Sequence, residues 1–208
     1  MFFKSLFMDK SSTQKNNFDA KLEEAIKLIR ANKSIVAARV LEVLDSHKVT
    51  INSFFNMSYK HFQEIQEDLL EEEKITIPSD YPPSDETVKI IEKTYSGIIY
   101  EDKHIYLNSE RSAEDIASTL VHEICHFLNS DIFKQEKRNS SSLLYRYKDE
   151  VRSFTAERIF ERDGHCVLRS DIKKVHAYVT EAYPEFVDPN EDMQKLGYVY
   201  SCYDMPRK

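Results

Sequence analysis

The segment from Thr119 to Asn129 reads TLVHEICHFLN and places two histidines four residues apart. On a helix, residues with this spacing lie one turn apart on the same face, so His122 and His126 can offer two imidazole nitrogens to one metal ion. Glu123 follows at about 100° around the helix axis, which puts it beside such an ion rather than on it. This is the HExxH pattern, in which zinc binds both histidines and the glutamate is the general base on the bound water. The alternative is a structural helix that carries two ordinary histidines.

A catalytic zinc normally has three protein ligands, so one more is needed. The longer pattern HExxHxxGxxH is excluded, because Asn129 and Ile132 stand where it requires glycine and histidine. The later segment KDEVRSFTAERIFE carries Glu150 and Glu157 seven residues apart, on nearly the same helix face and next to apolar residues. A carboxylate in that position needs a partner, and a metal ion is one. We predict Glu150 as the third ligand and Glu157 as a partner for the second nitrogen of a histidine. The alternative for either glutamate is a solvated surface charge.

The order of these features resembles the gluzincin branch of the zincin metallopeptidases: an apolar strand, a helix with HExxH, and a glutamate on a following helix. The segment EVRSF, which begins at Glu150, is similar to the Glu-x-Arg-x-Phe segment that supplies the third zinc ligand in clostridial neurotoxin light chains. Small HExxH peptidases that bacterial pathogens inject into host cells have a similar arrangement. The resemblance covers about residues 98 to 165. It implies a zincin fold, Zn²⁺, peptide hydrolysis, Glu123 as the base, and His122, His126 and Glu150 as ligands.

The chain departs from the thermolysin-like pattern, because Phe154 rather than an acid stands four residues after Glu150. Glu157 and Glu161 have that four-residue spacing instead, so the choice between Glu150 and Glu157 stays open. The group that would stabilise the oxyanion also stays open. Its candidates are Tyr147, Arg152, His165, Tyr198, Tyr200 and Tyr203.

Apolar residues at helical spacing predict the elements that must position these side chains. Ile116, Leu120, Ile124, Phe127 and Leu128 form an apolar stripe opposite the two histidines, which we expect to face a cleft or solvent. Two β-rich runs, at 98–100 and 104–107, flank a polar turn and predict a hairpin whose edge strand could pair with an extended substrate. The predicted helices cover about 18–31, 34–47 with Ser34 as N-cap, 54–73, 84–96 with Gly97 as stop, 112–133 with Ser112 and Asp115 as a capping box, and 143–163 with Gly164 as stop.

The proline-rich segment 75–85 is the expected seam between an N-terminal helical region, 1–77, and a zincin-like metallopeptidase domain, 78–208, unless both form one continuous unit. With only three glycines and six prolines, the chain should be α+β and mainly helical, with a short hairpin. The remaining histidines, at 47, 61, 104 and 176, are interpreted as surface or core residues, and Cys125 as a small hydrophobe.

The net charge of −7 and the absence of a dense cationic cluster argue against a nucleic-acid partner. Three cysteines without a short CxxC spacing suggest no disulfide framework and fit a reducing compartment. The N-terminal segment MFFKSLFMDKSS lacks a proper signal-peptide core, and no run is long enough to cross a membrane. We therefore expect a cytoplasmic protein by default, or one exported into a host cell by a signal-independent system.

These patterns together predict a zinc-dependent endopeptidase that acts on a protein or peptide substrate, with Glu123 as general base. The alternative is a helical protein-interaction module with a structural or vestigial metal site. A deformylase is disfavoured, because such an enzyme would need a cysteine ligand upstream of the motif and no cysteine precedes Cys125.

Overall fold

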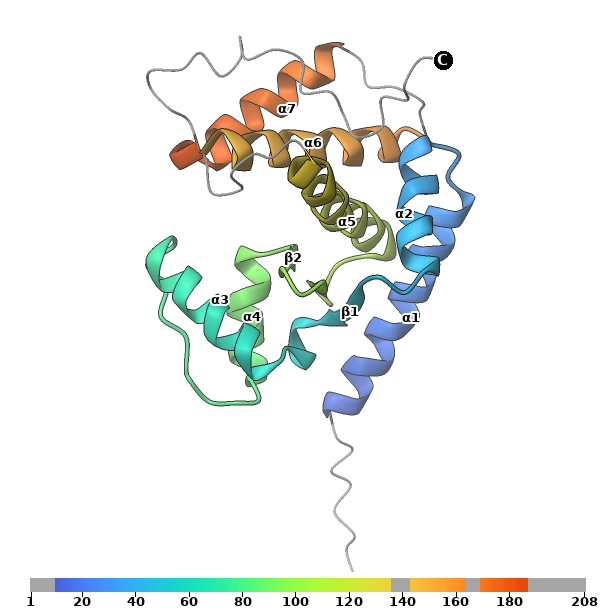
Figure 1. Cartoon of the computed structure of the whole chain (residues 1–208). Coiled ribbons are helices and arrows are strands. Elements are labelled where there is room, and N and C mark those ends of the chain that lie inside the picture. Colours follow the sequence, from blue (N-terminus) through green and yellow to red (C-terminus); the bar gives the residue numbers. More distant parts are fainter. Residues whose placement is uncertain (1–9, 136–142, 164–168, 187–208) are drawn as a thin grey trace, which may run out of the picture.

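The computed structural model describes residues 10–135, 143–163 and 169–186 (Figure 1). Within these ranges the protein is α+β and mainly helical, as predicted. The elements are, in chain order, α1 (Lys10–Ala31), α2 (Ile35–Asp45), β1 (Thr50–Ser53), the 3₁₀ turn η1 (Phe54–Asn56), α3 (Tyr59–Glu71), α4 (Asp85–Thr94), β2 (Gly97–Ile99), β3 (His104–Leu107), α5 (Ala113–Gln135), α6 (Leu143–Glu161), α7 (Arg169–Ala182) and the 3₁₀ turn η2 (Pro184–Phe186).

The strands form one small sheet in the order β1-β3-β2. The predicted hairpin is confirmed: β2 and β3 pair antiparallel, and the backbone N–H of Lys103 donates to the carbonyl of Tyr100 at 2.8 Å across the turn. β1, which the sequence analysis did not predict, pairs parallel with β3. Since β1 lies before residue 77 and β3 after it, the sheet crosses the expected seam and joins the two regions.

The central strand β3 sends alternate side chains to opposite faces of the sheet, as the pleat requires. Ile105 and Leu107 enter a core shared with α1, α2 and α5. Tyr106 points to the other side, into a second core that is built by η1, α3 and α4. α5 therefore lies on one face of the sheet, and α3 and α4 lie on the other.

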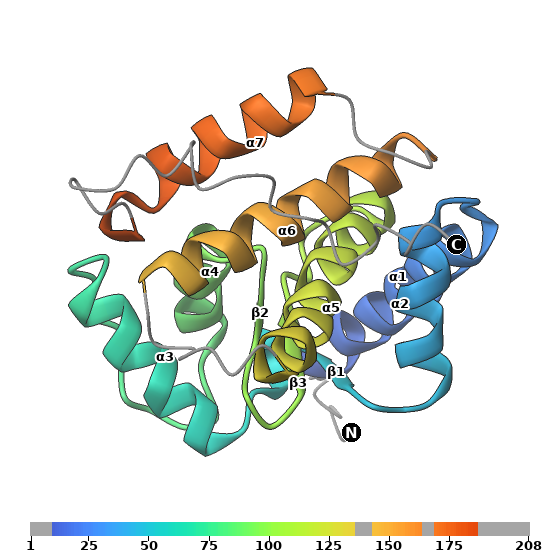
Figure 2. The same ribbon diagram turned by 45° about the horizontal axis from the view of Figure 1, so that its top comes forward.

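α6 packs across α5 on the side away from the sheet, and α7 packs on the outside of α6 (Figure 2). α5 is consequently enclosed, with Ile116, Leu120 and Ile124 fully buried as predicted and Cys125 buried in the same core. A third, smaller core joins α6 to α7 through Val151, Val175 and Val179. No prediction was made for α7, although its own apolar spacing is helical. No helix in the described part of the chain has the length and apolar character needed to span a membrane.

Serine N-caps fix where several helices begin, because the hydroxyl accepts a backbone N–H of the first turn. The expected Ser34 cap is confirmed by a 3.1 Å bond from the N–H of Ala37, and Ser112 accepts the N–H of Asp115 at 3.1 Å. The expected start of the third helix at residue 54 is wrong. Ser58 caps α3, which begins at Tyr59. The side chain of Tyr59 is 54% exposed.

Gly97 is not the stop of α4, contrary to the prediction. α4 ends at Thr94, and Gly97 is the first residue of β2. A Cβ atom at this position would lie 2.6 Å from Thr119 Cγ2 and 3.1 Å from Glu123 Oε1, so the glycine lets β2 approach α5 closely. The other predicted stop, Gly164, lies outside the described residues.

Candidate metal centre

His122 and His126 on α5 and Glu150 on α6 converge on one point. The two Nε2 atoms are 3.0 Å apart, Glu150 Oε2 is 3.5 Å from His122 Nε2, and Glu150 Oε1 is 3.7 Å from His126 Nε2. Ligand atoms that each lie about 2.0 Å from a tetrahedral zinc ion are about 3.3 Å apart. The three side chains thus have the separations of a shared coordination sphere.

The second nitrogen of each histidine faces a carboxylate. His126 Nδ1 lies 2.9 Å from Asp149 Oδ2, and His122 Nδ1 lies 3.4 Å from Glu157 Oε2. An ionised carboxylate can only accept, so Asp149 places the proton of a neutral His126 on Nδ1. The nearby charge of Glu157 favours the same tautomer of His122, although His122 Nδ1 makes no hydrogen bond to a described residue. The two Nε2 lone pairs then point at each other across 3.0 Å, which is unfavourable unless a cation or a proton lies between them. The residues present therefore fit a metal ion.

Glu150 fits the same conclusion. Its Oε2 is buried and makes no hydrogen bond to any described residue, although a buried carboxylate oxygen is costly to leave without a partner. Glu157 takes the other position, next to His122 Nδ1, and also accepts the Ser118 hydroxyl at 3.2 Å. The structure thus separates the two glutamates that the spacing could not distinguish.

Phe154 stands where the thermolysin-like pattern has an acid, and here it packs between α6 and α5. Its ring lies edge-on against the His122 imidazole, with 4.3 Å between the ring centroids, and fixes the ring from the side. The expectation that the imidazoles face a cleft or solvent is wrong, because His122 is only 8% exposed under α6. A pocket of about 460 Å³ lies between α6 and α7. Phe154 lines this pocket and also contacts His122, so its ring lies between the pocket and that histidine.

Glu123 occupies the interface between α5 and the edge strand β2. It is 7% exposed, and its Oε1 lies close to the backbone of Gly97. Burial raises the pKa of Glu123 above its ordinary value. A carboxylate with a raised pKa beside His122 and His126 is suited to accept a proton and to return it.

The cluster contains more carboxylates than imidazoles. Two histidines share their surroundings with four carboxylates, those of Glu123, Asp149, Glu150 and Glu157. Burial opposes protonation of His122, but Glu150 and Glu157 outweigh it and hold the pKa of His122 well above its ordinary value. Burial likewise opposes protonation of His126, while Asp149 and Glu150 raise the pKa of His126 to about 9. Protonation of the two imidazoles can therefore supply positive charge to the cluster.

The pKa of Glu150 is shifted downward, because cationic imidazoles favour its ionised form. Burial opposes its ionisation, but His126 and His122 outweigh burial and lower the pKa of the Glu150 carboxyl. This side chain is therefore an ionised carboxylate at neutral pH, which is the form that binds a metal ion.

Two of the candidates for oxyanion stabilisation, Tyr147 and Arg152, lie among the described residues. Tyr147 is buried, and its hydroxyl lies 2.7 Å from His176 Nδ1 on α7, away from the metal ligands. Arg152 is buried within α6. The remaining four candidates, His165, Tyr198, Tyr200 and Tyr203, lie outside the described residues.

Asp149 is a neighbour of the cluster that the sequence analysis missed. Besides facing His126 it accepts the Asn129 side-chain amide at 2.6 Å, while Ser153 Oγ lies 3.3 Å from the same His126 nitrogen. Asp149 directly precedes the predicted ligand Glu150, and this acidic pair was the available signal. Only the rotation of α6 about its axis decides which acid meets Nε2 and which meets Nδ1.

The comparisons with known proteins add no relative to this picture: no protein-family model, no curated protein and no solved structure matches the chain significantly.

Proposed function

We propose that this protein is a zinc-dependent endopeptidase with a gluzincin-like site. The observation that carries the proposal is the convergence of both Nε2 atoms and Glu150, with carboxylates on the opposite side of each ring and Glu123 buried beside the cluster. His122, His126 and Glu150 would hold the ion. When bound, zinc would supply Lewis acidity toward a peptide carbonyl and would lower the pKa of water.

The chain's own residues have distinct tasks in this scheme. Glu123 accepts a proton from the attacking water and delivers it to the leaving amine, which its buried position and raised pKa favour. Asp149 accepts the Nδ1 proton of His126, and the charge of Glu157 lies 3.4 Å from Nδ1 of His122, so that each ring presents its Nε2 lone pair to the ion.

The substrate that we propose is a protein or peptide in extended form. β2 is an edge strand of the sheet and begins beside Glu123, so a peptide that added to this edge would bring its backbone next to the base. The acidic net charge argues against nucleic acid as the substrate. The resemblance to injected peptidases supports action inside a host cell.

A second function, an interaction module with a structural zinc site, is favoured by one specific observation. His122 and Glu123 are both less than 10% exposed, and structural zinc sites are closed whereas catalytic sites keep a position open to substrate. This alternative predicts bound zinc without any hydrolysis by the wild-type protein.

The test uses the full chain and its Glu123→Gln variant on a cell lysate, with new protein N-termini identified by mass spectrometry and zinc measured on both proteins. We expect cleavage by the wild type, a decrease in rate of about 10²- to 10⁴-fold in the variant, and one equivalent of zinc retained at the cluster. Glu114→Gln is the matched control, because Glu114 is exposed on the same helix. Wild-type cleavage that survives in Glu123→Gln would reject the mechanism, and zinc without cleavage would favour the interaction module.

A further inference from the structure

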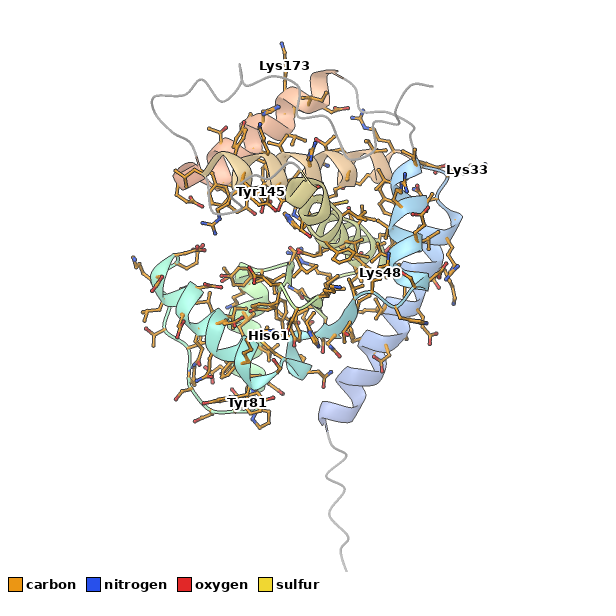
Figure 3. All side chains as sticks on the ribbon, viewed as in Figure 1. Lys33, Lys48, His61, Tyr81, Tyr145 and Lys173 are labelled. Carbon is orange, nitrogen blue, oxygen red and sulfur yellow. The ribbon has the colours of Figure 1, made fainter. Side chains whose placement is uncertain are left out.

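A second cluster of possible metal ligands lies on the other side of the sheet from α5. It consists of His61 on α3, Asp102 in the β2–β3 turn and His104 at the start of β3, and one ligand atom from each lies within 4.8 Å of the others. His61 belongs to the lower part of the molecule in Figure 3, far from α6 and its labelled Tyr145. The sequence analysis interpreted both of these histidines as ordinary ones.

Asp102 lies between the two imidazoles and presents a different oxygen to each. Asp102 Oδ2 is 3.0 Å from His61 Nε2, and Asp102 Oδ1 is 3.1 Å from His104 Nδ1. These separations are close to the roughly 3.3 Å expected between neighbouring ligands of a tetrahedral ion.

The buried His61 supplies an independent observation. The residue is 1% exposed, and its Nε2 has no hydrogen-bond partner among the described residues, although Asp102 Oδ2 lies 3.0 Å away. Two atoms that share a metal ion, each about 2.0 Å from it, would be this close without a hydrogen bond between them. The geometry suits two co-ligands better than a donor and its acceptor.

The other nitrogen of His61 is held in place. Its Nδ1 lies 3.0 Å from the Tyr106 hydroxyl, which also accepts the backbone N–H of Ser58 at 3.2 Å. The ring in addition stacks on Tyr100, with 4.1 Å between centroids. A ligating histidine commonly donates its second N–H to an oxygen that orients the ring, and the Tyr106 oxygen can accept that bond.

We propose that His61, Asp102 and His104 form a second metal site, for a divalent transition-metal ion of the zinc class. Imidazole and carboxylate ligands together suit Zn²⁺, and Co²⁺ as its spectroscopic substitute. The side chains of Asp102 and His104 are 43% and 36% exposed, so water has access to the remaining coordination positions.

The site ties α3 to the hairpin turn, two elements that are distant in sequence. Its ion therefore stabilises the hairpin, whose strand β2 borders α5 at Gly97. The inference does not depend on the proposed peptidase, because it concerns different residues on a different face of the sheet.

The experiment measures zinc bound to the full chain after removal of metal with a chelator and equilibration with Zn²⁺. Because His61 is buried, the variants are His104→Ala and Asp102→Asn at the exposed positions, with circular dichroism to verify folding. His47→Asn is the control, since His47 is exposed and its backbone φ of 50° is one that asparagine tolerates.

We expect each of the two variants to bind one equivalent of zinc fewer than the wild type. The loss of an outer-shell partner weakens metal affinity by roughly 10- to 100-fold, and the loss of a ligand should weaken it at least as much. The His122→Ala variant should keep one equivalent of zinc at the hairpin cluster, and the double variant His122→Ala/His104→Ala should lose it. Co²⁺ bound to the single variant His122→Ala should give the visible absorption of a coordinated ion. Zinc content that is unchanged in folded His104→Ala would overturn the proposal. Loss of all bound zinc in His122→Ala alone would also overturn it, while leaving the peptidase proposal intact.

Discussion

The two histidine clusters of this protein differ in what surrounds them. The cluster on α5 and α6 is enclosed between two packed helices and combines two imidazoles with four carboxylates. The cluster at the hairpin turn is half open and combines two imidazoles with one carboxylate. The first cluster therefore has more carboxylates than imidazoles, whereas the second has more imidazoles than carboxylates. The distances between possible ligand atoms are similar in the two clusters, so these distances do not distinguish them. Charge and burial do, and we expect the enclosed cluster to bind a metal ion more tightly than the half-open one.

The largest effect should follow from replacement of Glu150 by glutamine. The substitution removes the charged ligand of the helix cluster but leaves the hairpin cluster complete, so zinc at the first site and peptide hydrolysis should both decrease by more than about a hundredfold. Metal analysis and a cleavage assay measure the two effects. Glu181→Gln, at an exposed position on α7, is the control. Equal zinc content in Glu150→Gln and the control would assign the third ligand elsewhere.

Asp149→Asn should have a smaller effect on the same cluster. An amide oxygen accepts the Nδ1–H of His126 less strongly than a carboxylate, so zinc affinity should decrease by about 10- to 100-fold. Competition titration with a zinc-binding dye measures this, and Asp19→Asn on the exposed surface of α1 is the control. An unchanged affinity would mean that Asp149 does not orient His126.

Gly97→Ala tests the contact between the hairpin and α5. The new methyl group would lie 2.6 Å from Thr119 Cγ2, so we expect a decrease in the free energy of unfolding of about 1–3 kcal/mol. Denaturant unfolding measures it, with Ser96→Ala as the neighbouring control. If the variant kept wild-type stability, the strand would not pack against Glu123 as closely as described.

The last prediction concerns pH. The pKa of His126 is raised to about 9 in the folded metal-free protein and is about 6.5 when unfolded, so its protonation stabilises the fold fully below pH 6.5 and is lost as pH rises through 9. The melting temperature of the metal-free protein should therefore decrease over this interval. Zinc displaces the proton, so the loaded protein should not share the decrease. Identical pH profiles for both forms would contradict this.

The sequence predicted the parts of the site that lie within one helix and missed the parts that depend on packing between elements. The spacing of His122 and His126 sets one shared face by helix geometry alone. Glu150 lies on a second helix and was predicted from its apolar neighbours and from the family resemblance, with Glu157 as the open alternative. The roles of Asp149 and Glu157 depend on how α6 is rotated against α5. The same limit explains the exposure that was wrongly expected for the imidazoles, since apolar spacing on α5 gives no information about a covering helix.

The fold shows the same division. Serine caps and the hairpin are local features and were predicted from a few residues. β1 is only four residues long and is defined by its pairing with β3, more than fifty positions later in the chain. The cluster at His61 joins residues that are some forty positions apart, so no local pattern could indicate it.

The most direct test of the central claim is a crystal of the zinc-loaded protein, with anomalous scattering data collected on both sides of the zinc absorption edge. The account predicts a strong peak roughly 2.0–2.2 Å from His122 Nε2, His126 Nε2 and a Glu150 oxygen, with Glu123 beside it but not bound. A map without a peak at this position, or with the imidazoles turned away from each other, would contradict it.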